Sequence, residues 1–253
     1  MNFRFSVSFP FCCASGLALV LATAPCRADD TMQQPAKPAD SGHLHYLPAS
    51  HPDSEAILPP PPPPGSAEQA ADMDEVVAVY HACTSNEAAI AFSEKKFSVF
   101  IFTRAIGPFF QARKLPITEG FFERVEKDAA AITDTAKEYW KRPRPYTLDP
   151  SLASGKLEKS FGYPSGHSTE ATVLALVLSE IFPDKQDALL AISREIGWHR
   201  VEIARHYPTD IYAGRVFAKA IFREMKISPA FKHDLEVART EIQAAQRGLL
   251  AKP

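Results

Sequence analysis

A hydrophobic pattern with the three- and four-residue spacing of an amphipathic α-helix begins after Thr118. Thr118 is placed to cap this helix, and Pro143 and Pro145 are expected to end it. Lys137 should therefore lie on the last turns of the helix, with Arg144 in the loop just beyond. The apolar face is formed by Phe121, Val125, Ala129, Ile132, Ala136 and Trp140.

The rest of the second half also has helical patterning, without a convincing alternation that would indicate strands and without an internal repeat. The segment 165–182 is apolar almost all round, so we expect it to be the central helix. The other expected helices are two or three within 67–104, one each over 186–205 and 209–225, and an amphipathic one that opens at 228–229. The sequence therefore predicts an all-α domain over residues 66–253.

The first 28 residues have the features of a secretory signal peptide. Arg4 precedes a short apolar stretch, and small residues lead to an expected cleavage site after Ala28. The apolar stretch is short for the ~20 residues that a membrane-spanning helix needs, and no later run approaches that length. We expect a periplasmic or secreted protein with no membrane span in the mature chain. Residues 29–65, which include six consecutive prolines, should form an extended, poorly ordered lead-in.

Composition excludes some function classes. The formal net charge of −2 over 253 residues gives no case for nucleic acid as a partner. Of four cysteines, only Cys83 lies beyond the expected signal peptide, so the mature chain should form no internal disulfide.

Three short motifs in the second half carry residues suited to phosphoryl transfer: 137–145, 164–167 and 200–210. This chemistry requires stabilisation of negative charge on the phosphoryl oxygens and in-line placement of the nucleophile and leaving group. The motifs supply three cations, and arginine forks match phosphate oxygens two at a time. These cations are Lys137, Arg144 and Arg200.

The second and third motifs add an anion-binding turn and two histidines. Ser165 and Gly166 stand at an expected helix start, where free backbone N–H groups favour an anion. Asp210 follows His206 by four residues, so its carboxylate can accept from one ring nitrogen and leave the other nucleophilic. His167, beside the turn, could protonate the leaving oxygen. We expect a pH optimum below neutrality, with His167 protonated while His206 is not.

Together these motifs resemble the signature of the type-2 phosphatidic acid phosphatase superfamily, K-x6-R-P, P-S-G-H and S-R-x5-H-x3-D. Within it the chain is most similar to the bacterial class A nonspecific acid phosphatases. The proline-rich segment 58–64, the stretch 162–167 and the segment 228–231 contribute to this likeness, which covers roughly residues 56–245.

The resemblance implies a compact single-domain helical bundle and a periplasmic phosphomonoesterase that uses neither metal nor other cofactor. It implies that His206 is the nucleophile that forms a phosphohistidine, that His167 is the acid, and that Asp210 orients His206. It implies small phosphorylated substrates and inorganic phosphate as ligands, and a homo-oligomer, often a dimer. The implied phosphate-binding residues are Lys137, Arg144, Ser165, Gly166 and Arg200.

One position departs from the signature, because His199 stands where the family has the serine before Arg200. Serine is small, whereas histidine is larger and titrates near neutrality. Two orientations stay open. His199 points away from the site, or it faces inward and narrows the pocket or adds a pH-dependent contact.

Three other functions compete with a secreted acid phosphatase. A vanadate-dependent haloperoxidase uses the same type of site, because vanadate mimics phosphate, but the chain is short for that family. A periplasmic lipid-phosphate phosphatase is disfavoured by the lack of spanning helices. A non-catalytic phosphate-binding protein would have no need for both histidines and Asp210.

Overall fold

The computed structural model describes residues 44–48 and 51–248, and the expected signal peptide lies outside this part of the chain. All regular secondary structure in the described residues is helical, with no strand, which confirms the all-α prediction. None of the helices in these residues is both long enough and apolar enough to cross a bilayer.

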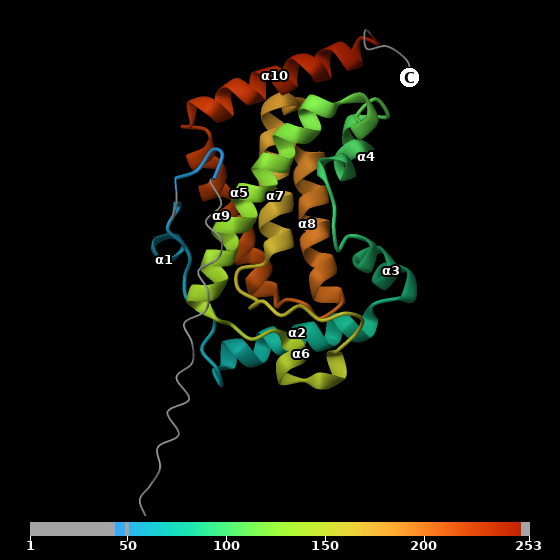
Figure 1. Ribbon diagram of the computed structural model, residues 1–253. Helices are drawn as coiled ribbons and strands as arrows, with labels where there is room; N and C mark the ends of the chain where they lie inside the picture. The colour runs from blue at the N-terminus through green and yellow to red at the C-terminus, as the bar shows by residue number, and fades with distance from the viewer. Residues whose placement is uncertain (1–43, 49–50, 249–253) are drawn as a thin grey trace, which may run out of the picture. The chain divides into compact units, whose positions relative to one another are not determined.

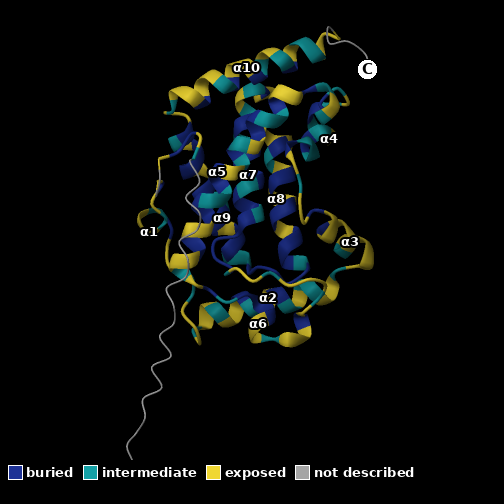
Figure 2. Ribbon diagram, viewed as in Figure 1, coloured by how far each residue is buried: buried dark blue, intermediate teal, exposed yellow. Residues whose placement is uncertain are grey.

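Four long helices form the core of the domain: α5 (Pro116–Trp140), α7 (Gly166–Ile181), α8 (Gln186–Glu202) and α9 (Pro208–Met225). Helix α7 lies between the other three and packs on each of them (Figure 1). It is buried along most of its length, as predicted for the central helix (Figure 2). The ends of α5 and α8 and the starts of α7 and α9 lie at one end of the bundle, where α2 (Ala67–Ala82) crosses.

The other helices cover this core. Helix α10 (Pro229–Gln246) packs across α5, and the predicted apolar face of α10 is buried. Its buried residues are Phe231, Leu235, Ala238 and Ile242. The shorter α-helices are α1 (Ser54–Ile57), α3 (Ser85–Ser93), α4 (Thr103–Ile106) and α6 (Pro145–Leu148). Four 3₁₀ helices complete the described part: Val99–Phe102, Ala112–Lys114, Pro150–Leu152 and Pro183–Lys185.

The start of α5 differs from the prediction. Thr118 does not cap the helix, which begins two residues earlier at Pro116. Instead Thr118 is buried, and its backbone N–H and hydroxyl both donate to Glu241 Oε2 of α10 at 2.7 Å. The backbone N–H of Ile117 donates to Glu241 Oε1 at 3.1 Å. A remote carboxylate thus satisfies the free donors at the helix start that a local cap would otherwise serve.

Helix α8 ends at Glu202, earlier than the predicted boundary at 205. The chain turns at Ala204, whose φ of 51° lies in the left-handed region. The backbone N–H groups of Arg205 and His206 both donate to the carbonyl of Arg200, at 2.8 and 3.2 Å. This compact turn fixes His206 between α8 and α9.

The described part of the lead-in is anchored, contrary to the expected poor order. The buried carboxylate of Asp128 on α5 accepts three backbone hydrogen bonds, from His45 at 2.9 Å, Tyr46 at 2.7 Å and Leu47 at 3.2 Å. The side chains of Tyr46 and Leu47 are buried in the core. Further along, the Tyr163 hydroxyl donates to the Pro59 carbonyl at 2.6 Å, so the proline run begins against the domain.

Two glycines allow α8 and α9 to approach the start of α7 closely. A Cβ atom on Gly214 of α9 would lie 2.8 Å from the Ser165 carbonyl oxygen and 2.9 Å from Ser168 Cβ. A Cβ atom on Gly197 of α8 would lie 3.3 Å from Ser168 Oγ of α7 and 3.0 Å from Ile211 Cγ2 of α9. The Ser168 hydroxyl donates to the Ile211 carbonyl at 2.8 Å and ties α7 to α9. These contacts hold the first turn of α7 in place.

Candidate active site

The residues predicted to handle phosphate all lie at the bundle end where these helix termini meet. Lys137 lies on the last turn of α5 and Arg200 on the last turn of α8. Ser165 is the N-cap of α7, and Gly166 and His167 are its first two residues. Arg144 precedes α6, His206 lies in the turn after α8, and Asp210 is on the first turn of α9.

The His206–Asp210 pair has the geometry expected of an oriented imidazole. His206 Nδ1 lies 3.3 Å from Asp210 Oδ2, and the same oxygen accepts from the Tyr207 backbone N–H at 2.9 Å. Asp210 Oδ1 accepts from Arg142 Nη1 at 2.6 Å. Burial raises the pKa of Asp210 to about 6, against the opposing effect of Arg142. At neutral pH the carboxylate is therefore ionised and can hold the ring.

The partners of His206 define its tautomer. Arg144 Nη1 lies 3.1 Å from His206 Nε2, and because a guanidinium has only donors, Nε2 must accept. The proton of the neutral ring is then on Nδ1, which donates to Asp210. Burial and the charges of Arg144, Lys137 and Arg200 lower the pKa of His206 well below its usual value. The ring is thus neutral with a lone pair on Nε2, which is the form a nucleophile requires.

The cations are fixed before any ligand binds. Arg144 donates from Nε to the Ser160 carbonyl at 2.8 Å, from Nη2 to the Ser160 hydroxyl at 3.1 Å, and from Nη1 to the Arg205 carbonyl at 3.0 Å. Lys137 Nζ would lie 3.2 Å from a Cβ on Gly166, so the missing side chain leaves room for the ammonium above the start of α7. Preorganised charges of this kind stabilise a transition state without reorganisation.

His199 turns toward Glu94, the residue that follows α3. His199 Nδ1 lies 2.7 Å from Glu94 Oε2, and both side chains are buried. Arg200 Nη2 lies 3.5 Å from the same oxygen and donates to the carbonyl of Ala91. Burial lowers the pKa of Arg200 to about 10, so the guanidinium stays charged at neutral pH.

His167 is not protonated in the free protein, and this part of the prediction was wrong. Burial and the positive charges of Arg200 and Lys137 lower the pKa of His167 to about 3. Its Nε2 lies 3.2 Å from the Glu94 carbonyl oxygen, which can only accept, so Nε2 carries the proton of the neutral ring. The sequence placed His167 beside the cations but gave no measure of their summed effect on its charge.

Residues 129–232, which contain all of these predicted residues, match the PAP2 superfamily. The matched residues form a PAP2-superfamily domain. The chain is 31% identical over 158 residues to a non-specific acid phosphatase of Salmonella typhi, covering 60% of this chain and 63% of that protein. It is 34% identical over 146 residues to one of Providencia stuartii, covering 53% and 59%. It thus spans about three fifths of the length of these curated relatives.

A solved structure of a transmembrane PAP2 type phosphatidylglycerolphosphate phosphatase from Bacillus subtilis also aligns with the chain. Its TM-score is 0.47 at 20% sequence identity, over 68% of this chain and 88% of that one.

Arg142 and Asp72 hold Asp210 and the start of α9 in the candidate active site, but the sequence analysis missed both residues. Arg142 donates to Asp210 Oδ1 and, through Nη2, to Asp72 Oδ2, each at 2.6 Å, and its guanidinium lies 4.0 Å from the Tyr207 ring centroid. Asp72 also accepts from the Thr209 backbone N–H at 3.2 Å. The dense basic stretch 141–144 was the only signal for Arg142, and Asp72 on α2 gave none.

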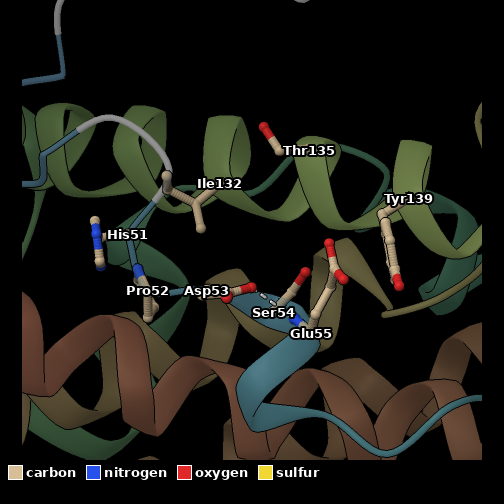
Figure 3. Close-up of a pocket in the computed structure, with 8 residues that line it drawn as sticks. All are labelled: His51, Pro52, Asp53, Ser54, Glu55, Ile132, Thr135 and Tyr139. Atoms are coloured by element: carbon tan, nitrogen blue, oxygen red, sulfur yellow. Dashed lines mark hydrogen bonds between the residues drawn. The ribbon is translucent and has the colours of Figure 1, made fainter.

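A separate cavity of about 420 Å³ lies between the lead-in and α5 (Figure 3). It is lined by residues 51–55 together with Ile132, Thr135 and Tyr139. This lining contains two carboxylates, no Lys or Arg, and none of the predicted phosphate-handling residues. The cavity is therefore not suited to a phosphate group and is distinct from the candidate active site.

Proposed function

We propose that this chain is an acid phosphatase that hydrolyses small phosphomonoesters through a phosphohistidine formed on His206. The observation that carries the proposal is the tautomer of His206, whose Nδ1 faces Asp210 while its unprotonated Nε2 lies 3.1 Å from Arg144. A buried, neutral and oriented imidazole among cations is suited to attack on phosphorus. The similarity to proteins named non-specific acid phosphatases supports the same reaction class.

In this proposal the phosphoryl oxygens bind to Lys137, Arg144 and Arg200. The Ser165 hydroxyl and the free backbone N–H groups at the start of α7 complete the site. The charges of these three cations already reach His206, since each lowers its pKa. A helix N-terminus adds a favourable dipole for an anion.

In the first step, His206 Nε2 attacks phosphorus, the P–O bond to the leaving group breaks, and the leaving oxygen takes a proton. Because His167 is neutral in the free protein, we propose that this proton arrives with the substrate. A phosphomonoester monoanion carries one proton below a second pKa of about 6. His167 accepts it, since the bound phosphoryl charge offsets the cations, and passes it to the leaving oxygen. This accounts for an acidic optimum without a protonated free enzyme.

In the second step, water attacks the phosphohistidine, the P–N bond breaks and inorganic phosphate leaves. His167 takes a proton from the attacking water and returns it to the departing phosphate. The lone pair on His206 Nε2 is thereby restored. Asp210 holds the ring in the same orientation through both steps, as expected for an orienting carboxylate.

We extend the proposal to the location of the enzyme, its metal dependence and its oligomeric state. The features of residues 1–28 support export to the periplasm or the medium. Independence from metal ions and assembly as a dimer follow from the family resemblance and remain predictions.

The test is phosphate release from p-nitrophenyl phosphate by the purified protein at mildly acidic pH in the presence of a chelator, with inhibition by vanadate. No turnover under these conditions would refute the proposal. Bromide oxidation by peroxide after vanadate loading would then indicate a haloperoxidase. Turnover confined to phosphorylated lipids would indicate a lipid-phosphate phosphatase.

A further inference from the structure

Glu94 contacts three residues of the candidate site although it comes from outside the three motifs. Its carboxylate oxygen Oε2 lies 2.7 Å from His199 Nδ1 and 3.5 Å from Arg200 Nη2. Its backbone carbonyl lies 3.2 Å from His167 Nε2. The side chains of Glu94 and Arg200 are both buried, so these charges are poorly screened by water. One residue therefore touches a phosphate-binding cation and the acid.

We propose that Glu94 and His199 are positioning residues, and that the His199–Glu94 pair keeps the Arg200 guanidinium available to the phosphoryl group. This rests on the proposed function, in which Arg200 binds phosphate. A buried carboxylate 3.5 Å from Arg200 competes with phosphate for the same cation. His199 lies nearer to that carboxylate and, when protonated, neutralises it. Arg200 is also held by the carbonyl of Ala91, which carries no charge.

The surroundings of His199 favour its protonated form. The hydrogen bond to Glu94 raises the pKa of His199 despite burial, and the charges of Glu94, Glu202 and Glu195 add to this. Glu195 Oε1 lies 4.0 Å from His199 Nε2 and is paired with Arg104, and the more distant Glu87 on α3 also interacts with the ring. The only cation facing the pair is Arg200, among the contacts of the described residues.

The sign of the pH effect follows from this charge balance. Below the pKa of His199 the ring is protonated, Glu94 is neutralised and Arg200 binds phosphate at full strength. Above that pKa the Glu94 charge acts on Arg200 and weakens phosphate binding. The carbonyl that holds His167 belongs to the Glu94 backbone, so changes to the Glu94 side chain should alter phosphate affinity and KM more than kcat.

The experiment measures the dissociation constant of inorganic phosphate by calorimetry from acidic to alkaline pH. It compares wild type with His199→Gln, Glu94→Gln and the double variant. Dividing the dissociation constant of each variant by that of wild type at the same pH removes the effect of the titration of phosphate itself. At acidic pH, His199→Gln should bind about tenfold more weakly, because glutamine cannot neutralise Glu94. At alkaline pH the ratio should fall to about one, since the wild-type ring is then neutral as well.

The double variant is the decisive comparison, because removing the Glu94 charge should restore the affinity that His199→Gln loses. Glu195→Gln serves as the matched control. It removes another carboxylate near His199, on its exposed side, and should leave phosphate affinity unchanged at acidic pH, where His199 is protonated with or without Glu195. Thermal unfolding of each variant checks that the fold is retained. His199→Gln with wild-type affinity at acidic pH, or a double variant as weak as His199→Gln, overturns the proposal.

Binding and turnover separate this proposal from the proposed function. Wild-type protein that binds phosphate but hydrolyses no phosphomonoester would refute only the proposed function. Active enzyme whose variants show no change in phosphate affinity would refute only the role of the pair. Wild-type protein that binds no phosphate would overturn both.

Discussion

Replacing Gly214 by alanine tests the close packing that holds the start of α7. The new Cβ would lie 2.8 Å from the Ser165 carbonyl oxygen and 2.9 Å from Ser168 Cβ. Ordinary contact begins at 3.4 Å, so the helices would have to separate by about 0.6 Å. Neither neighbouring atom can swing aside, because one is backbone and the other is fixed directly to it.

Two opposing effects set the magnitude. Overpacking a tight contact costs about 1–3 kcal/mol. Alanine has a better helix propensity than glycine by about 1 kcal/mol, which offsets part of that cost. With two contacts below 3.0 Å we expect the upper part of the range, and hence a net loss of about 2 kcal/mol in the free energy of unfolding. The strain falls on Ser165, so phosphate affinity should also decrease.

Urea unfolding measures the first effect and phosphate titration the second. Gly120→Ala, within α5, is the matched control, because its Cβ would meet only Arg124 Nη1 at 3.7 Å. That variant should gain up to about 1 kcal/mol of stability and bind phosphate normally. Gly214→Ala with wild-type or higher stability would refute the packing argument. Lower stability with unchanged phosphate affinity would refute only the link to Ser165.

Three further predictions follow from the site. Arg142→Met should destabilise the fold by about 3–5 kcal/mol in urea unfolding, because it leaves Asp72 and Asp210 buried without their shared cation, and a near-neutral result would contradict this role. His206→Ala should abolish the phosphoenzyme in acid-quench trapping, and a phosphoenzyme that persists would rule out this nucleophile. The profile of kcat/KM should be bell-shaped, since Asp210 takes up a proton below its pKa of about 6 and the substrate monoanion is lost at alkaline pH. In Asp210→Asn the residual rate should lose the acidic limb, and an unchanged limb would exclude Asp210 as its source.

Local patterns predicted the helices well. The apolar faces of α5 and α10 follow from side-chain spacing alone, and their burial confirms them. The three motifs meet in the structure because each stands at a helix end. The signal peptide over residues 1–28 and the dimer remain predictions.

Long-range polar partners could not be predicted in the same way. Asp72 is 70 residues from Arg142, and Glu241 is 123 residues from Thr118. A hydrophobic pattern indicates which face of a helix is buried, but it does not say which distant carboxylate satisfies a buried donor. The Thr118 cap failed for this reason. The prediction that His167 is protonated failed for a related reason, because its pKa depends on burial together with several cations that are distant in the sequence.

Because the four core helices run antiparallel, two helix C-termini and two helix N-termini meet at the end of the bundle that carries the candidate active site. Helix C-termini favour cations and N-termini favour anions. Lys137 and Arg200 occupy the last turns of α5 and α8, Asp210 occupies the first turn of α9, and the start of α7 is the proposed place for phosphate. Each charged group thus sits at the helix end that stabilises it. The proposed phosphate site is assembled from charges that the fold already favours. Asp134 beside Lys137 and Glu158 beside Arg144 are partly exposed to water, whereas Glu94 beside Arg200 is buried and has His199 as its partner.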